Sequence, residues 1–184
     1  QRHGMMATFM AKWSENEAGQ SGHIHVSLTA PGGAGNLFHD ATADDGPGVT
    51  MRHFIGGQQA MMPELTALFA PTVNSYRRLV PGLWAPTVAN WGIDNRTCAL
   101  RALPGSEKAV RVEHRLPGAD CNPYLALAAA IASGLHGIEH QMDPGSPVDG
   151  NAYAEVFPEE RQLPRSLEEA GARFASSTMA RDWF

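Results

Sequence analysis

The segment GHIHVSL, residues 22–28, alternates polar and apolar side chains with the period of a β-strand. His23, His25 and Ser27 therefore share one face of the predicted strand, and three aliphatic side chains occupy the other. Neutral imidazole is a common metal ligand, and a hydroxyl can contact a phosphate or sugar oxygen. Two histidines alone do not make a closed metal site, so this face is either a ligand-binding surface or a solvent-facing surface with incidental histidines.

The segment VRVEHRL, residues 110–116, repeats this alternation with charged side chains. Arg111, Glu113 and Arg115 share one face, while two valines and His114 lie on the other. A cation, an anion and a cation on one strand can form a solvated ladder. The valines and the final leucine of the segment, however, require that the opposite face is buried. The pattern therefore predicts a strand with a charged face above a hydrophobic core.

Basic residues gather near this strand although the chain as a whole is acidic, with a net charge of -5. They are Arg77, Arg78, Arg96, Arg101, Lys108, Arg111 and Arg115. Because the planar guanidinium suits carboxylates and phosphates, this clustering indicates an anion that carries several charges. Glu113 together with a histidine can hold Mg²⁺ or Mn²⁺, which bridges phosphate oxygens. The residues predict a site for a metal-bound nucleotide, with phosphoryl transfer as the reaction class.

The segment NSYRRLVPGLWAP, residues 74–86, is predicted to be a shaped loop, because its two prolines fix the backbone and remove amide donors. It places a large aromatic residue, Trp84, near its end. An aromatic side chain in a loop either packs the loop or contacts a ligand.

The whole chain has 184 residues, of which 43% are apolar and 18% are charged, as expected for one globular domain. Its acidic balance argues against a non-specific binder of nucleic acid or of membrane surfaces. No apolar run is long enough to span a membrane, and the first residues lack a signal-peptide pattern, so a cytoplasmic protein is expected. Cys98 and Cys121 follow no metal-ligand spacing and are expected to be free thiols.

Strands are predicted over residues 5–12, 22–28, 96–103 and 110–116, helices over residues 51–69 and 166–175, and an exposed glycine-rich connection over residues 31–49. The strongest helical signal begins at Asn122, a capping residue, and Pro123, which suits the first turn. This helix is expected to end near residues 143–144. Its apolar stripe, the pattern of a helix that packs on a core, consists of Leu127, Ile131, Leu135, Ile138 and Met142. Because strands and helices do not alternate regularly, the predicted fold class is α+β with a largely antiparallel sheet.

Four motifs carry a resemblance to a known family: GHIHVSL, NSYRRLVPG, NRTCALR and VRVEHRLPGADCNPYLALAA. Their order and spacing resemble the catalytic domain of glutamine synthetases over nearly the whole chain. The resemblance implies a half-barrel of strands backed by helices, in subunits that assemble into stacked rings with each active site between neighbours. Residues 1–184 are then part of one catalytic domain, without the small N-terminal domain of the family and without its first metal-ligand strands.

The resemblance also implies a reaction, in which ATP and L-glutamate form γ-glutamyl phosphate and an amine then displaces phosphate. His23 and Glu113 would share a metal ion, Mg²⁺ or Mn²⁺. The residues implied to contact ATP are His25, Ser27, Arg96, Arg101, Lys108 and Arg111. Those implied to bind the other substrates are Gly19, Arg78, Trp84 and Arg115, and the candidate catalytic residues are Arg96 and Trp84.

The chain departs from the family pattern at two of these places. The Asn-Gly pair that contacts glutamate in the family corresponds to Ala18 and Gly19. Trp84 stands where members that use ammonia place a glutamate on a flexible loop, which helps to bind and deprotonate ammonium.

The second departure bears on the amine. Ammonium has no apolar surface, whereas an organic amine offers a carbon chain that an indole can cover, with a cation–π contact of about 0.5 to 2 kcal/mol. Trp84 therefore favours the branch of the family that makes γ-glutamyl amides of polyamines or alkylamines. Two alternatives remain: a glutamine synthetase that uses ammonia, in which Trp84 only packs the loop, and a structural protein that keeps the fold without catalysis.

Overall fold

A sheet with the strand order β1-β4-β3-β2 is the centre of the computed structural model, which describes residues 2–42 and 46–184. Its strands are β1 (Ile24–Val26), β2 (Trp91–Ile93), β3 (Leu100–Leu103) and β4 (Arg111–His114). The β1–β4 and β3–β4 pairs are antiparallel, and the β2–β3 pair is parallel. The predicted α+β class with a largely antiparallel sheet is confirmed, and the sheet is open at its edges.

The register of the sheet brings three polar residues of distant segments into one row. His25 of β1 is the pairing partner of Glu113 of β4, and Arg101 of β3 pairs with the same Glu113 from the other side. Residues paired across neighbouring strands point to the same face of a sheet. The opposite face of β4 turns to the core, where His114 packs on Phe69 with ring centroids 4.5 Å apart. Burial lowers the pKa of His114 to about 3, so its ring is neutral.

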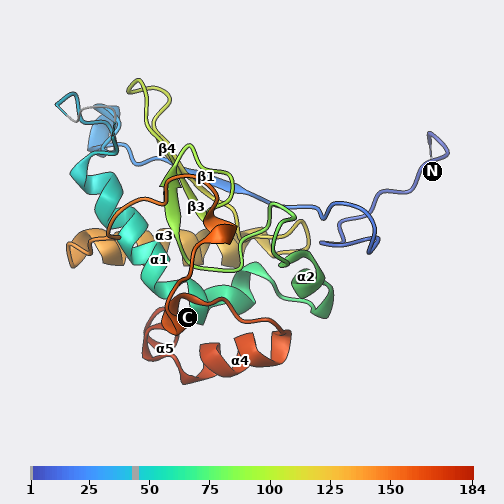
Figure 1. Cartoon of the computed structure of the whole chain (residues 1–184). Coiled ribbons are helices and arrows are strands. Elements are labelled where there is room, and N and C mark those ends of the chain that lie inside the picture. Colours follow the sequence, from blue (N-terminus) through green and yellow to red (C-terminus); the bar gives the residue numbers. More distant parts are fainter. Residues whose placement is uncertain (1, 43–45) are drawn as a thin grey trace.

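Two long helices, α1 (Val49–Phe69) and α3 (Pro123–Glu139), pack closely against each other beside the sheet (Figure 1). Glycines bring their backbones together: a Cβ on Gly57 would lie 2.1 Å from the Ser133 carbonyl oxygen, and one on Gly137 2.2 Å from the His53 carbonyl oxygen. The predicted helix over residues 51–69 is confirmed, and it continues through Pro63 without a break.

The orientation of α3 differs from the expectation. The helix begins as predicted, with the Asn122 side chain accepting from the Tyr124 amide, and it ends at Glu139, before residues 143–144. Its buried residues are small, namely Ala126, Ala129, Ala130, Ser133, Gly134 and Gly137. Leu127, Ile131 and Leu135 of the predicted stripe point outward, with 42%, 41% and 48% of their surface exposed. The stripe prediction was wrong for these three residues, because close backbone contact with α1 admits only small side chains at the interface, whereas Ile138 of the stripe does pack against the core.

Three other segments also differ from the prediction. Residues 74–78, expected in a loop, belong to the short helix α2 (Val73–Arg78), whose capping box joins Thr72 and Ser75. The strand expected over residues 96–103 includes only Leu100–Leu103, because the Asn95 side chain accepts from Thr97 and forms a turn. Residues 5–12, expected as a strand, form an extended arm without strand pairing in the described part of the chain (Figure 1).

The C-terminal part of the chain adds two helices, α4 (Leu167–Ser176) and α5 (Thr178–Trp183), and α4 packs on α1. The predicted cap at Ser166 is present, since its side chain accepts from the Glu169 amide. Short 3₁₀ turns span Pro31–Gly33, Ala152–Ala154 and Glu159–Arg161. Residues 43–45 of the predicted exposed connection lie outside the described residues.

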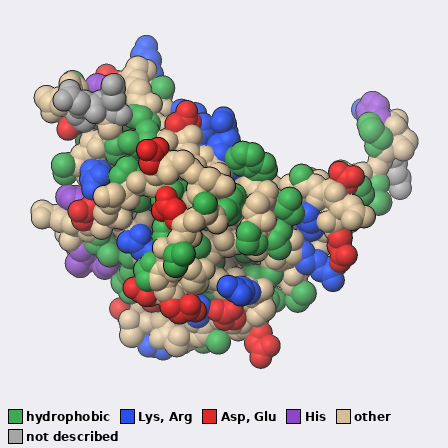
Figure 2. All heavy atoms as spheres, in the orientation of Figure 1, with side chains coloured by type: hydrophobic (Ala, Val, Ile, Leu, Met, Phe, Trp, Pro, Cys, Tyr) green, Lys and Arg blue, Asp and Glu red, His purple; other side chains and the backbone are tan. Residues whose placement is uncertain are grey.

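The two cysteines are free thiols, as the sequence predicts. Cys98 is buried and Cys121 is partly buried. Acidic and basic side chains are interspersed on the face shown in Figure 2. Among the described helices, none combines the length and the hydropathy that crossing a membrane requires.

Candidate active site

The centre of the charged sheet face is the carboxylate of Glu113, which is 4% exposed. Its Oε1 atom lies 2.9 Å from His23 Nδ1 and 2.9 Å from Arg115 Nη1, and its Oε2 atom lies 2.9 Å from Arg101 Nη1. One carboxylate thus joins β1, β3 and β4, and it meets two guanidinium groups and one imidazole.

The balance of these contacts fixes the charge of Glu113. Burial by itself would raise the pKa of this carboxyl group, but the hydrogen bonds from His23 and Arg101 and the positive charge of Arg115 outweigh it. The pKa of Glu113 is therefore lowered from its ordinary value, and the group is a carboxylate at neutral pH. An ionised, buried carboxylate next to imidazole is a donor set that divalent cations accept.

His25 lies beside this centre. Its Nε2 atom is 4.0 Å from Glu113 Oε1, and its Nδ1 atom accepts a hydrogen bond of 3.1 Å from Arg111 Nε. Burial, together with the charges of Arg111 and His23, lowers the pKa of His25, against the opposing effect of Glu113. His25 is therefore neutral at pH 7, and its Nε2–H is a donor suited to a phosphate or sugar oxygen.

Arg78 and Arg115 are both buried and are close enough for the charge of Arg115 to act on Arg78. Burial is the main reason that the pKa of Arg78 is lowered to about 10. Arg78 donates through Nη2 to the Leu116 carbonyl, while the Nε atoms of both arginines have no hydrogen-bond partner in the described part of the structure. Gly19 allows this packing, because a Cβ at residue 19 would lie 2.5 Å from Arg78 Cγ. Guanidinium Nε donors of this kind suit a carboxylate acceptor.

Three predicted residues lie outside this centre. Ser27, Arg96 and Lys108 are exposed, and no hydrogen bond or ion pair joins them to the Glu113 cluster within residues 2–42 and 46–184. The structure therefore brings together His23, His25, Arg101, Arg111, Glu113 and Arg115, places Gly19 and Arg78 next to Arg115, and leaves the other three at the surface.

Trp84 lies on the loop after α2 and is 62% exposed. Its backbone has a positive φ of 60°, in the left-handed region that residues with a side chain rarely adopt. The Trp84 carbonyl accepts a hydrogen bond of 3.3 Å from Arg115 Nη2, which connects this loop to the charge cluster. The indole lines an open hollow of about 430 Å³ with Thr97, Asn151 and Tyr153.

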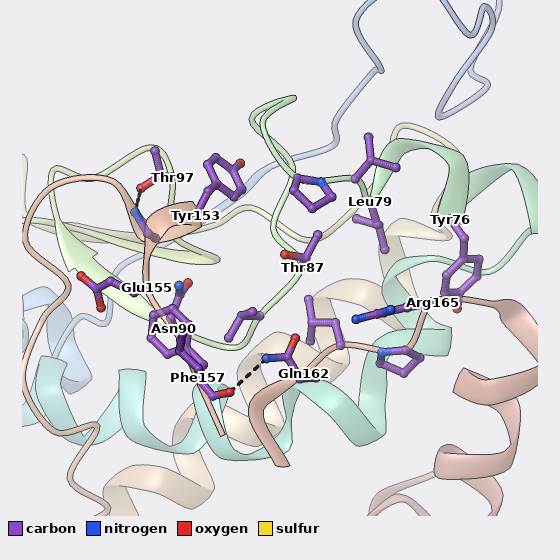
Figure 3. Close-up of a pocket in the computed structure, with 17 residues that line it drawn as sticks. Tyr76, Leu79, Thr87, Asn90, Thr97, Tyr153, Glu155, Phe157, Gln162 and Arg165 are labelled. Carbon is purple, nitrogen blue, oxygen red and sulfur yellow. Dashed lines mark hydrogen bonds between the residues drawn. The ribbon is translucent and has the colours of Figure 1, made fainter. Parts of the chain in front are cut away.

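A larger cavity, of about 570 Å³, is lined mainly by residues of the segments 76–90 and 152–165 (Figure 3). Its walls include Tyr76, Thr87, Tyr153 and Gln162, and none of the residues that contact Glu113 lines it. The charge cluster is instead on an open sheet face. We therefore propose the cluster, where ionised groups converge, and not this cavity, as the place of the chemistry.

Two residues of the site were missed by the sequence analysis. Asp94 follows β2 with a φ of 48°, and its Oδ1 accepts from Arg101 Nε at 2.9 Å. The hydrogen bond and the charge of Arg101 lower the pKa of Asp94. Tyr153 donates from its hydroxyl to the Ala85 carbonyl at 3.1 Å and so holds the end of the Trp84 loop. Neither residue belongs to a sequence motif, and each contact is formed only in the tertiary fold, so the sequence carried no signal for them.

Comparison with known proteins identifies the family. The model of the glutamine synthetase catalytic domain matches residues 1–184. The γ-glutamylethanolamide synthetase GlnA4 of Streptomyces coelicolor is 45% identical over 183 residues, which are 100% of this chain and 38% of the relative. The glutamate–isopropylamine ligase of a Pseudomonas species is 45% identical, over 98% of this chain and 39% of the relative.

Glutamine synthetases are also among the relatives. That of Thermotoga maritima is 40% identical over 91% of this chain and 39% of its own length. The solved structure of a GmaS/ADP complex superposes with a TM-score of 0.86 at 38% identity, over 98% of this chain and 42% of that chain. The chain spans about two fifths of the length of these relatives. It belongs to the glutamine synthetase catalytic-domain family.

Proposed function

We propose that the protein carrying this chain joins the γ-carboxylate of L-glutamate to an organic amine, with ATP as the second substrate. The observation that carries the proposal is Trp84, an exposed indole on a loop whose backbone is hydrogen-bonded to Arg115 of the charge cluster. The names of two relatives support it, since one makes an ethanolamide and the other uses isopropylamine.

The charge cluster supplies the groups for a metal-bound nucleotide. Glu113 and His23 would hold a divalent cation, Mg²⁺ or Mn²⁺, because an ionised carboxylate and an imidazole adjoin there at 2.9 Å. When bound, the ion neutralises negative charge on the phosphates. We assign Arg101 and Arg111 to the same phosphates and His25 to a hydrogen bond with ATP. Ser27, Arg96 and Lys108 are assigned to the nucleotide from the surface around the cluster.

The glutamate substrate is assigned to the buried arginine pair. Arg78 and Arg115 each present an Nε donor without a partner in the described structure, and Gly19 packs closely against Arg78. A substrate carboxylate would satisfy donors that are otherwise costly to bury. This assignment positions the distal carboxylate of glutamate toward the phosphate-binding arginines.

The reaction proceeds in two steps in this proposal. A γ-carboxylate oxygen attacks the terminal phosphorus of ATP, the bond from that phosphorus to the bridging oxygen breaks, and ADP leaves. The bound amine gives up its ammonium proton to water, and its nitrogen then attacks the acyl carbon of γ-glutamyl phosphate. The carbon–oxygen bond to phosphate breaks, and a second proton passes from the nitrogen to the departing phosphate or to water. Arg96 is assigned to the charge that develops on the transferred phosphoryl group.

Trp84 is assigned to the amine. An indole can cover an alkyl chain and attract a protonated amine through its ring face, whereas ammonium offers no carbon surface. The alternative substrate is ammonia, because glutamine synthetases are among the relatives. The further alternative is a non-catalytic member of the family.

The direct test is ATP-dependent phosphate release by the full-length protein with glutamate and Mg²⁺, comparing ammonia with ethanolamine, putrescine, spermidine and alkylamines. We expect turnover with an organic amine well above that with ammonia. Trp84→Glu should shift the preference toward ammonia, while Trp13→Glu, which changes another exposed tryptophan, should not. Turnover with ammonia alone would assign a glutamine synthetase, and absence of both turnover and Mg²⁺-ATP binding would assign a non-catalytic protein.

We also propose that the full-length protein is a homo-oligomer of stacked rings. Large apolar side chains are exposed on the outward face of α3 and on the N-terminal arm, among them Leu127, Ile131, Leu135, Met6 and Phe9. Surfaces of this kind support burial against other parts of the polypeptide or a neighbouring subunit. Light scattering after size-exclusion chromatography tests the assembly, and a monomer that is fully active would contradict it.

A further inference from the structure

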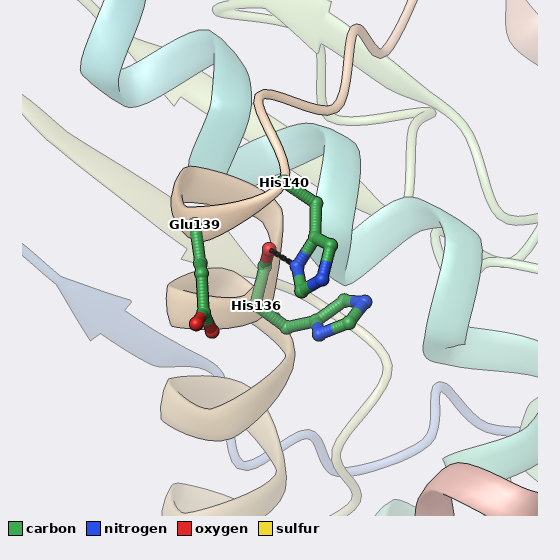
Figure 4. Close-up of side chains that lie close together, drawn as sticks. All are labelled: His136, Glu139 and His140. Carbon is green, nitrogen blue, oxygen red and sulfur yellow. Dashed lines mark hydrogen bonds between the residues drawn. The ribbon is translucent and has the colours of Figure 1, made fainter.

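A second group of potential metal ligands lies at the C-terminal end of α3, apart from the charge cluster. His136, Glu139 and His140 occur at positions i, i+3 and i+4, which adjoin on a helix surface. Figure 4 shows the three side chains leaving the last turn of α3, with the two imidazole rings next to each other and Glu139 alongside. One ligand atom of each side chain lies within 4.8 Å of those of the other two.

The two rings are arranged as a pair. Their centroids are 3.9 Å apart with an interplanar angle of 33°. His140 Nδ1 lies 3.0 Å from the His136 carbonyl oxygen, which can only accept, so Nδ1 carries the proton and Nε2 keeps its lone pair. A hydrogen bond from one ring nitrogen to a backbone carbonyl is the arrangement that orients metal-binding histidines and raises the basicity of the other nitrogen.

We propose that His136, Glu139 and His140 form a binding site for a first-row transition ion such as Zn²⁺, separate from the nucleotide-metal site. Two imidazoles and one carboxylate suit this class of ion, whereas Mg²⁺ prefers oxygen ligands alone. Around a tetrahedral Zn²⁺ with Zn–N bonds of about 2.0 Å, ligand atoms lie roughly 3.3 Å apart, so the side chains need to close by about 1.5 Å at most. Glu139 and His140 are exposed and have room for this rotamer adjustment.

The surroundings favour a cation in two further ways. The partial negative charge at the end of a helix attracts positive ions, and this group lies on the last turn of α3. Glu139 also places a carboxylate beside the two imidazole rings, which adds negative charge next to the ion (Figure 4). The site would also connect α3 to α5, because the Trp183 ring meets the His136 ring edge-on at 5.4 Å.

Calorimetric titration of the full-length protein with Zn²⁺, in an excess of Mg²⁺ that occupies the nucleotide-metal site, tests this proposal. We expect His140→Ala to weaken one class of Zn²⁺ site by about 10- to 100-fold or more, and Glu139→Gln to weaken it less. The matched control is His39→Ala, which removes an exposed histidine elsewhere and should leave the titration unchanged. Equal numbers and affinities of bound Zn²⁺ in His140→Ala and His39→Ala would overturn the proposal.

A spectroscopic readout separates this site from the active site. Ni²⁺ bound next to Trp183 should quench part of the tryptophan fluorescence, and Trp183→Phe should abolish that part of the quenching. Quenching that survives in the His136→Ala, His140→Ala double variant but is lost in His23→Ala would place the ion at the Glu113 cluster instead. Neither measurement depends on catalytic activity, so failure of the proposed ligase function would leave this test intact.

Discussion

The Glu113 cluster and the Trp84 loop are in contact, yet they are built in opposite ways. Glu113 and Arg115 are each 4% exposed, and both belong to a network of ion pairs across neighbouring strands. Trp84 is 62% exposed and stands in a left-handed backbone conformation. The cluster is thus fixed by sheet register and burial, while the loop residue is held by its backbone and its side chain is free to meet solvent or ligand.

Under the proposed function, this difference corresponds to a division of tasks. Groups that bind charged substrates common to the whole family need fixed positions, which strands and buried pairs provide. A residue that selects among amines needs a surface position, where a change of side chain does little to the core. Substitutions in the two regions should therefore differ in their effects on stability and on substrate preference.

Glu113→Gln should have the largest effect. Removing the carboxylate charge leaves Arg115 buried without a counter-ion and Arg101 with Asp94 alone, which we expect to cost about 3 to 5 kcal/mol of unfolding free energy. Activity of the full-length enzyme should fall by about 10²- to 10³-fold or more. The control is Glu15→Gln, in an exposed pair with Arg77, which should change stability by less than about 0.5 kcal/mol in urea unfolding. If Glu113→Gln and Glu15→Gln changed the unfolding free energy by similar amounts, Glu113 would not be the residue that stabilises the cluster.

Gly57→Ala should come next, because it tests the helix layer that supports the sheet. The new methyl group would lie 2.1 Å from the Ser133 carbonyl oxygen, so α1 and α3 must separate, at a cost of about 1 to 3 kcal/mol. Gly171→Ala in α4, where nothing lies within 4 Å of the added Cβ, should instead stabilise the protein by up to about 1 kcal/mol. Thermal unfolding of the two variants measures this contrast, and a stabilised Gly57→Ala variant would contradict the close helix contact.

The pH dependence of the unfolding free energy tests the charge state of Glu113 in the cluster. The pKa of Glu113 is lowered in the folded state, so its contribution to stability is complete above the ordinary carboxyl pKa of 4.5. That contribution is lost as the pH falls below this value toward the lowered pKa. The free energy of unfolding should therefore decrease with acid more steeply in the unchanged protein than in Glu113→Gln. Parallel curves for the two proteins would show that Glu113 is not held as a carboxylate by its partners.

Trp84→Gly should have the smallest effect on folding. Glycine adopts a positive φ without strain, which offsets its greater freedom in the unfolded chain, so stability should change by less than about 1 kcal/mol. Loss of the indole should raise KM for the organic amine by about 2- to 30-fold, with KM for glutamate unchanged. An unchanged KM for the amine would assign Trp84 to loop packing.

The sequence predicted the charged faces of β1 and β4 well, because alternation with period two is a local property that strands preserve. The orientation of α3 was mispredicted for a physical reason. Hydropathy marks Leu127 and Ile131 as core residues, but the interface with α1 is made mainly of alanine and glycine. These small residues let the two helix backbones approach closely and contribute little apolar area. In the sequence, the adjacent Gly56 and Gly57 are the signal of this close approach.

The site shows the same limit at single residues. Asp94 and Tyr153 are each hydrogen-bonded to a partner on another segment. Residue spacing in the sequence does not predict such contacts. The short helix α2 was hidden by the prolines that follow it, although Thr72 and Ser75 form its capping box. Local periodicity therefore located the strands that carry charge, while close packing and single long-range contacts required the structure.

The hydrogen bond from Arg115 to residue 84 uses the backbone carbonyl, an atom that every amino acid provides. Replacing the side chain at this position therefore leaves the attachment of the loop intact. A saturation library confined to residue 84 should yield variants that accept different amines, while KM for glutamate stays nearly constant. Under the proposed role of Trp84, new acceptor substrates would become accessible in evolution through a single codon, without a compensating change in the sheet.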